Sequence, residues 1–194
     1  MTVLKSILMR TFGRPRGTLG KLGGMIMART NAAFARSAIG LIDIQPTDKV
    51  LEVGFGPGVG IELLAKSAPA GRVAGIDRST EMLQQAKLRN AAAIAGGLVD
   101  LRHGAVENLP FEDSTFDVVL AINSMQVSPD VMAGLREIWR VTRPGGRVVL
   151  GFTRHSGQPR AGMAETLSTA GFDEARLVET EHGFCALALK PRPG

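Results

Sequence analysis

The sequence predicts an α/β fold in which a doubly wound sheet of about seven strands is mostly parallel and has an antiparallel last strand. From residue 49 onward, short apolar runs alternate with segments of helical periodicity, which is typical of a parallel sheet with crossover helices. The first four apolar runs are almost uninterrupted, as expected when helices cover both faces of the sheet. The last two runs meet at His182 and Gly183, a spacing that predicts a tight hairpin.

The same patterns place the individual elements. We expect strands at residues 49–54, 72–77, 98–103, 116–122, 146–153, 174–181 and 183–190, and helices at 58–68, 79–95, 129–142 and 159–170. Ser79 is expected to cap its helix, with Glu81 in the first turn, and Pro129 to occupy the first turn of another. Gly171 follows the last helix, at a position where glycine commonly ends one.

Charge divides the chain into two parts. The 194 residues fit one domain of ordinary size, and the net charge is +5. Residues 1–42 carry seven Lys or Arg and no acid, so the remainder sums to −2. We therefore divide the chain into a basic N-terminal helical arm or lid at 1–44 and a ligand-binding domain at 45–194.

The arm begins with a segment of amphipathic character. Apolar residues recur at helical spacing on one face, while Lys5 and Arg10 lie elsewhere. The apolar residues are Val3, Leu4, Ile7, Leu8 and Phe12. Three interpretations stay open: the arm covers the active site, lies on an anionic membrane, or packs against the domain or a second subunit, which would make a homodimer.

Composition also bears on the compartment. The lone Cys185 excludes an internal disulfide framework, and no apolar run reaches the ~18 residues of a membrane span. We expect a cytoplasmic protein, with peripheral contact at the inner membrane as the alternative. The arm shares its Arg-rich composition with transit peptides, but we expect no cleaved leader. Arg outnumbers Lys 17 to 6, which suggests a bacterial source.

A glycine-rich loop follows the first expected strand. The segment 50–60, VLEVGFGPGVG, runs from an apolar strand through alternating glycines into a helix. This arrangement lets the backbone approach a ligand at a helix N-terminus. Val59 stands where the dinucleotide fingerprint requires glycine, and no glycine is followed by the G-K-[ST] of a P-loop. Neither of those two nucleotide sites is therefore predicted.

The remaining pattern, E-x-G-x-G-x-G, resembles motif I of class I S-adenosylmethionine-dependent methyltransferases, which have a Rossmann-like fold. Three further matches follow in register: Asp77 at the end of the second strand, 107–117 (ENLPFEDSTFD) and 143–146 (RPGG). The resemblance covers residues 45–190 and is strongest to the small-molecule, ubiquinone-biosynthesis-like (type 11) branch. It implies S-adenosylmethionine as cofactor and S-adenosylhomocysteine as product.

The resemblance also implies a set of cofactor-binding residues. Glu52 would hold the methionine amino end, and Asp77 would accept hydrogen bonds from the ribose hydroxyls. The full implied set is Glu52, Gly54, Gly56, Gly58, Asp77, Arg78, Ala105, Val106 and Asn123. Related sequences place Asp at the position of Ala105, where it contacts the adenine amino group. We expect its loss to weaken binding by ~1 kcal/mol, with backbone amides near Val106 still available.

The methyl acceptor is expected at the carboxyl ends of the strands, where ligands sit in open α/β sheets. The residues placed there are Asn123, Ser124, Met125, Gln126, Arg154 and His155. His155 is the candidate general base, and an exposed loop histidine is the alternative. Because alignment and water exclusion can accelerate an in-line displacement, a base is optional. No metal is expected, and His103 and His182 are interpreted as structural.

The expected acceptor is a small molecule. Residues 123–126 read NSMQ, and not the (D/N)-P-P-(Y/F) of similar enzymes that methylate exocyclic amines of bases. The chain has no tyrosine and one tryptophan, too few for a base-stacking surface, so nucleic acid is disfavoured. The predicted function is methyl transfer to a small molecule. The alternatives are a membrane-surface lipid or quinone methyltransferase and a non-catalytic S-adenosylmethionine-binding protein.

Overall fold

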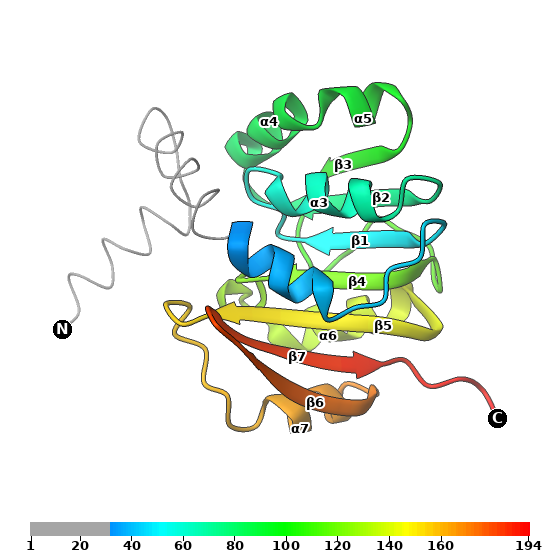
Figure 1. The fold of residues 1–194 in the computed structure, drawn as a ribbon. Coiled ribbons are helices and arrows are strands. Elements are labelled where there is room, and N and C mark those ends of the chain that lie inside the picture. The colour runs from blue at the N-terminus through cyan, green and yellow to red at the C-terminus, as the bar shows by residue number, and fades with distance from the viewer. Residues whose placement is uncertain (1–31) are drawn as a thin grey trace.

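A computed structural model describes residues 32–194, in which seven strands form one sheet between two layers of helices (Figure 1). The strand order is β3-β2-β1-β4-β5-β7-β6. Strands β1 to β5 pair in parallel, and β7 runs antiparallel to both β5 and β6. The predicted fold class, a mostly parallel sheet with an antiparallel last strand, is confirmed.

The strands are β1 (Lys49–Val53), β2 (Arg72–Asp77), β3 (Val99–His103), β4 (Phe116–Ile122), β5 (Thr142–Thr153), β6 (Asp173–Thr180) and β7 (Gly183–Leu189). The helices are α3 (Val59–Ser67), α4 (Thr80–Arg89), α5 (Ala91–Ala95), the 3₁₀ turn η1 (Met125–Val127), α6 (Val131–Val141) and α7 (Met163–Thr169). The expected hairpin is present, because Thr180 pairs with Gly183 across a two-residue turn.

Successive residues of each strand face opposite layers. In β1, Val50 packs under α3 and α4, whereas Leu51 packs against α6 and α7 on the other face. Both residues are fully buried. This alternation places Glu52 on the same face as Val50, toward α3. Both faces of β1 are covered, which explains why the sequence of this strand is apolar almost throughout.

The described part of the predicted arm belongs to the core of the molecule. Residues 32–40 are helical and cover the sheet on the same face as α3 (Figure 1). Phe34 and Ala38 are fully buried, and Phe34 lies against Gly151 of β5. The amphipathic segment at residues 3–12 lies outside the described residues, and the division of the chain at residue 44 stays a prediction.

The prediction of one long helix at 79–95 is wrong, because two helices, α4 and α5, meet at Asn90. The buried Asn90 side chain donates hydrogen bonds from Nδ2 to the carbonyls of Gly58, at 3.0 Å, and Ala86, at 2.9 Å. Asn90 therefore ties the end of α4 to the glycine loop. Ser79 caps α4 as predicted, since its Oγ accepts a hydrogen bond from the Met82 amide.

Two other helices are shorter than predicted. Pro129 precedes α6 and is not in its first turn, because Asp130 is the cap and accepts a hydrogen bond from the Ala133 amide. Helix α7 begins only at Met163, after Gly162 adopts a positive φ of 79°. Strand β5 is longer than predicted, since it starts at Thr142.

The sheet has one edge at which the carboxyl ends of its parallel strands gather. The arrowheads of β1 and β5 point to the same side of the molecule, and that of β7 points to the opposite side (Figure 1). The loops that follow β1 to β4 therefore meet at one edge, where ligands bind in open α/β sheets. No helix within residues 32–194 has the length and hydropathy needed to span a bilayer.

Candidate active site

A cavity of about 170 Å³ opens at this carboxyl edge. Its wall comes from the segments that follow β1, β2, β3 and β4, with Ala35 and Met82 contributed by helices. Eight of the nine predicted cofactor residues line it: Glu52, Gly54, Gly56, Asp77, Arg78, Ala105, Val106 and Asn123. The structure thus brings together residues that lie up to 71 positions apart.

The glycine loop enters the cavity immediately after β1. Gly54 has a φ of +74°, and a Cβ added there would lie 2.3 Å from the Cβ of Ser124. Only glycine lets the ends of β1 and β4 approach this closely. Ser124 completes the junction, because its Oγ donates a hydrogen bond to the carbonyl of Val53 at 2.8 Å.

Asp77 holds the glycine loop in place from the end of β2. Its Oδ2 accepts a hydrogen bond from the Gly56 amide at 2.8 Å, and its Oδ1 accepts one from the Ser79 amide at 2.9 Å. Burial raises the pKa of Asp77, although these two hydrogen bonds act in the opposite direction. Each carboxylate oxygen keeps a second lone pair, so Asp77 can still accept hydrogen bonds from ligand hydroxyls.

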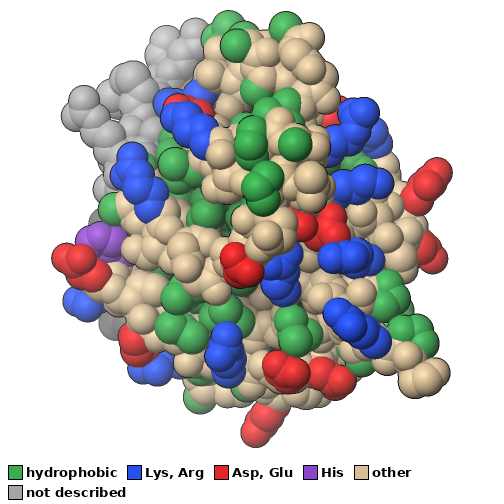
Figure 2. All heavy atoms as spheres, turned by 45° about the vertical axis from the view of Figure 1, so that its right-hand side comes forward, with side chains coloured by type: hydrophobic (Ala, Val, Ile, Leu, Met, Phe, Trp, Pro, Cys, Tyr) green, Lys and Arg blue, Asp and Glu red, His purple; other side chains and the backbone are tan. Residues whose placement is uncertain are grey.

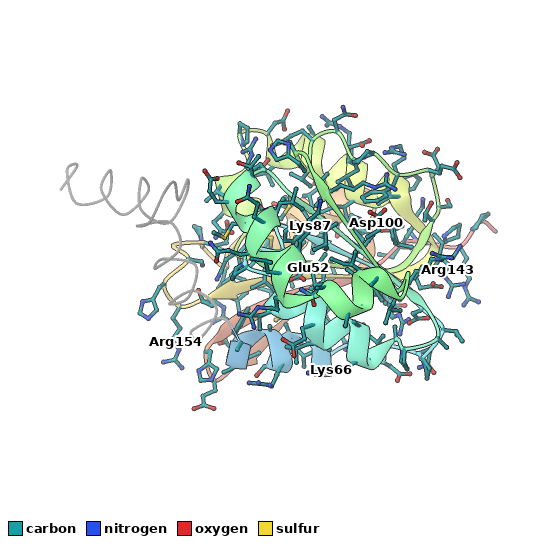
Figure 3. The ribbon with its side chains drawn as sticks, turned by 90° about the horizontal axis from the view of Figure 1, so that it is seen from above. Glu52, Lys66, Lys87, Asp100, Arg143 and Arg154 are labelled. Carbon is teal, nitrogen blue, oxygen red and sulfur yellow. The ribbon has the colours of Figure 1, made fainter. Side chains whose placement is uncertain are left out.

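Glu52 lies in the interior, beneath the start of α3, and only 3% of it is exposed (Figure 3). Its Oε1 is so near α3 that a Cβ on Gly60 would lie 2.1 Å away. Its Oε2 is buried without a hydrogen-bond partner in the described chain. Burial, and then the charge of Asp77, raises the pKa of Glu52 to about 8.

An orphaned buried carboxylate oxygen in a cavity wall is costly unless a ligand satisfies it. A cationic amino group fits that requirement, because it donates hydrogen bonds and lowers the pKa of the carboxyl group. The described residues therefore fit the ammonium end of an amino-acid-bearing cofactor at Glu52 and a group with hydroxyls at Asp77.

Another part of the cavity wall is formed by the loop after β3. Ala105 and Val106 line it with apolar groups, and Glu107 lines it with a carboxylate. Ser128 Oγ donates a hydrogen bond to Glu107 Oε1 at 2.5 Å, and Arg78 Nη2 lies 4.0 Å from Glu107 Oε2. Glu107 therefore links the loop after β3 to the loops after β2 and β4.

Asn123 joins the ends of β4 and β5. It adopts a positive φ of 50°, and its Oδ1 accepts hydrogen bonds from the amide and the hydroxyl of Thr153, at 2.9 and 3.2 Å. Oδ1 of Asn123 thus holds the ends of β4 and β5 together. Asn123 and Ser124 both line the cavity, as predicted, and each also positions a neighbouring strand.

Five predicted site residues do not line the cavity. Gly58 instead packs on α4, where an added Cβ would lie 2.7 Å from the Cβ of Ala86. Met125 is buried in the core beside α6. Arg154 and His155 are exposed on the loop after β5, and Figure 3 shows Arg154 at the margin of the molecule. Gln126, in η1, is not among the lining residues, and its Oε1 is buried.

Sequence reasoning missed several lining residues. Val127 and Ser128 were missed because the turn η1, which brings them to the cavity, left no pattern. Glu107 was assigned only to a family motif, and Ala35 belongs to the predicted arm. For Glu107 a signal existed, since an acid follows closely after a strand that ends at the ligand edge.

Arg143 and Cys185 both lie outside the cavity wall. Arg143 forms an ion pair with Asp117 at 2.5 Å, and Figure 3 shows Arg143 at the end of the molecule opposite Arg154. Cys185 is fully buried in β7, and burial raises its pKa to about 12. Within residues 32–194, no three His, Cys, Asp or Glu side chains converge as metal ligands would.

Comparison with known proteins defines the class. Residues 51–150, just over half of the chain, match the family described as a methyltransferase domain, type 11. The chain therefore belongs to this methyltransferase family. It is a class I enzyme that depends on S-adenosylmethionine, and the expected cofactor and enzyme class are confirmed.

The curated relatives add detail. The uncharacterized methyltransferase YdaC of Bacillus subtilis is 29% identical over 187 residues, which cover 88% of this chain and 98% of YdaC. The ubiquinone/menaquinone biosynthesis C-methyltransferase UbiE of Geotalea daltonii is 33% identical over 61% of this chain and 51% of UbiE. The demethylmenaquinone methyltransferase of Bacillus cytotoxicus is 34% identical over 66% of this chain and 54% of its own. The chain thus spans about half the length of these quinone methyltransferases.

Solved structures agree on the fold. A SAM-dependent methyltransferase from Aquifex aeolicus superposes with a TM-score of 0.70 at 21% identity, covering 80% of this chain and 89% of its own. An N-methyltransferase from Haemonchus contortus, solved with phosphomonomethylethanolamine and S-adenosylhomocysteine, has a TM-score of 0.76 at 15% identity, covering 99% and 61%. At these identities the likeness concerns the fold alone.

Proposed function

We propose that this chain transfers the methyl group of S-adenosylmethionine to a small-molecule acceptor by in-line displacement. The observation that carries the proposal is the buried, unpartnered Oε2 of Glu52, in one cavity with the loop-bound carboxylate of Asp77. The two carboxylates suit the amino and ribose ends of the cofactor. Bound there, S-adenosylmethionine supplies an electrophilic methyl group on a sulfonium and leaves as S-adenosylhomocysteine.

The roles of the chain's own residues follow from their contacts. Glu52 accepts hydrogen bonds from the ammonium group and holds that end of the cofactor under α3. Asp77 accepts hydrogen bonds from the ribose hydroxyls, while the hydrogen bonds that it already accepts keep Gly56 and Ser79 in position. Asn123 and Ser124 bind neighbouring strands, so the cavity edge is rigid before the ligands arrive.

Positioning and water exclusion are the proposed sources of rate acceleration. The described part of the cavity wall contains no histidine, and its ionisable acids are Glu52, Asp77 and Glu107. His155 stays a candidate base on the exposed loop after β5. An acceptor that reacts as a phenolate, an enolate or a free amine needs no proton removal during the transfer step.

Two features favour a small acceptor: the sequence after β4 and the distribution of charge on the surface. The NSMQ sequence after β4 lacks the tetrapeptide used on nucleobase amines. The face shown in Figure 2, which lies away from the carboxyl edge, mixes basic and acidic side chains, whereas nucleic-acid interfaces gather basic residues. Both observations support a small molecule over a nucleic acid.

Calorimetric titration with S-adenosylmethionine and S-adenosylhomocysteine tests the proposal. We expect the wild type to bind both and Asp77→Ala to weaken binding at least about tenfold, since hydrogen bonds to ligand and loop are lost. Asp100→Ala is the matched control, because Asp100 on neighbouring β3 (Figure 3) is exposed, and its side chain pairs with Arg102 among residues 32–194. A wild type that binds neither compound would refute the proposal.

A second candidate, methylation of a quinone or lipid at a membrane surface, is favoured by the two relatives whose names state quinone methylation. Production of S-adenosylhomocysteine should be measured with demethylated quinols, small phenols and small amines. Turnover with quinols alone would support the second candidate, and turnover with polar amines alone would exclude it.

A further inference from the structure

Three acidic side chains line the described cavity wall: Glu52, Asp77 and Glu107. Glu52 lies on β1, Asp77 ends the neighbouring strand β2, and Glu107 follows β3, the next strand of the sheet. Glu107 contacts Ser128 and Arg78, which belong to the loops after β4 and β2. A ligand that extends from Glu52 past Asp77 to the loop after β3 therefore meets a third acidic side chain there.

The contacts of Glu107 hold its carboxylate in place at the loop after β3. Its side chain is only 20% exposed, and Ser128 Oγ donates a hydrogen bond to Oε1 at 2.5 Å. Arg78 Nη2 lies 4.0 Å from Oε2, which is too far for a hydrogen bond. Oε2 is thus fixed in direction by the Ser128 contact and retains the capacity to accept a hydrogen bond.

The side chains of Ala105, Val106 and Val127 beside Glu107 are apolar and cannot accept a hydrogen bond from a ligand. Ala105 presents only a methyl group, at the position where similar sequences carry Asp, and Val106 and Val127 add apolar surface. A flat aromatic ring can lie against such apolar side chains, with its polar edge toward the carboxylate. Among the side chains of this loop that line the cavity, Glu107 alone can accept a hydrogen bond from that edge.

We propose that Glu107 selects adenine in the cofactor by accepting a hydrogen bond from its exocyclic amino group, in place of the aspartate missing at Ala105. The inference rests on the proposed binding of S-adenosylmethionine in this cavity. An ionised carboxylate attracts an amino donor and repels a carbonyl oxygen at the same position. Glu107 therefore discriminates between an adenine and a purine that carries oxygen at that position.

The probes are S-adenosylhomocysteine and S-inosylhomocysteine: in the second, a carbonyl replaces the amino group and the adjacent ring nitrogen N1 carries a hydrogen. Their dissociation constants are measured by calorimetry for the wild type, Glu107→Gln and Glu107→Ala. We expect the wild type to prefer the adenosyl compound by about tenfold or more. The glutamine amide both donates and accepts, so Glu107→Gln should reduce this ratio several-fold, and any preference that stays reflects the difference at N1.

Glu112→Gln is the matched control, because Glu112 is exposed and lies outside the cavity wall, and its ratio should equal that of the wild type. Thermal unfolding identifies folded variants, and Glu107→Ala tests the same loss of preference should Glu107→Gln not fold. An unchanged preference in either folded variant would overturn the inference. A wild type that binds neither compound would instead overturn the proposed function.

Discussion

The neutral form of Glu52 favours the folded ligand-free protein, whereas its ionised form favours binding of a cationic ligand. Its carboxyl group is buried under α3 with Oε2 unpartnered, and burial raises its pKa to about 8. Without ligand, the folded chain keeps a proton on Glu52 across neutral pH. The group that suits a cationic ligand therefore destabilises the ligand-free protein once it ionises.

This gives a pH dependence of stability with a defined sign. The folded pKa lies near 8 and the ordinary value is 4.5, so the folded state binds more protons between these values. The stabilisation is fully present below pH 4.5 and is lost as the pH rises through 8. We expect the unfolding free energy of the wild type to fall relative to that of Glu52→Gln by a few kcal/mol, at ~1.4 kcal/mol per pKa unit.

Urea unfolding at pH 5 and pH 9 measures this difference. Glu112→Gln serves as the control, since the side chain is exposed and its replacement should leave the wild-type slope unchanged. Equal pH slopes for the wild type and Glu52→Gln would contradict the assignment of the raised pKa to Glu52.

At the scale of elements, the glycine loop depends on its fit against α4. Gly58 has a φ of +82°, and an added Cβ would lie 2.7 Å from the Cβ of Ala86. Asn90 binds the carbonyl of Gly58 from the end of the same helix. The start of α3 is therefore held by α4, and a change at Gly58 should affect the stability of both helices.

The variant Gly58→Ala should be strongly destabilised. A left-handed backbone costs an alanine ~1–2 kcal/mol, and overpacking against α4 adds ~1–3 kcal/mol. Gly157→Ala is the matched control, because Gly157 has a φ of +73° with no atom within 4 Å of the added Cβ. Urea midpoints should fall much further for Gly58→Ala, and equal shifts would show that packing at α4 contributes nothing.

Helix boundaries show the limit of local patterns. Periodicity alone joined residues 79–95 into one helix, since nothing near Asn90 in the sequence indicates that its side chain binds Gly58, 32 positions away. The start of α6 was also missed, because Pro129 and Asp130 are both acceptable near a helix start. The capping of α4 by Ser79 was predicted correctly because it depends on neighbours three residues apart.

At the scale of the whole molecule, the distribution of charge is uneven. Residues 1–42 contain seven Lys or Arg and no acid, while the face in Figure 2 mixes both signs. The described chain begins beside the cavity, since Ala35 lines its wall. We propose that the basic residues before this point bring the cavity edge to an anionic surface.

Deletion of residues 1–16 removes four positive charges and no acid. We expect the full chain to co-sediment with phosphatidylglycerol vesicles at low salt and the truncated chain to remain in the supernatant. The affinity of both for S-adenosylhomocysteine should agree within about twofold, because every residue of the described cavity wall is retained. High salt should release the full chain, since it screens such contacts.

Phosphatidylcholine vesicles provide the neutral control. Equal sedimentation of the full and truncated chains with the anionic vesicles would exclude the arm as a membrane contact. Two interpretations of the arm would then stay open: that it covers the active site, or that it packs against the domain or a second subunit.

The sequence by itself determined the class of fold, the family and the two carboxylates expected in the cofactor site. These features depend on short-range patterns: apolar runs between helical segments, a strand that leads into glycines, and an acid at the next strand end. The resemblance to the methyltransferase motifs singled out Glu52 and Asp77 at strand ends, and both line the cavity.

Only the tertiary structure decided which residues of each loop face the cavity. The turn η1 buries Met125 in the core and brings Val127 and Ser128 to the wall, although the three are near neighbours in sequence. Ala35 reaches the wall because its helix packs across the sheet. Such orientations depend on contacts between distant segments, and the one that links Ser128 to Glu107 joins residues 21 positions apart.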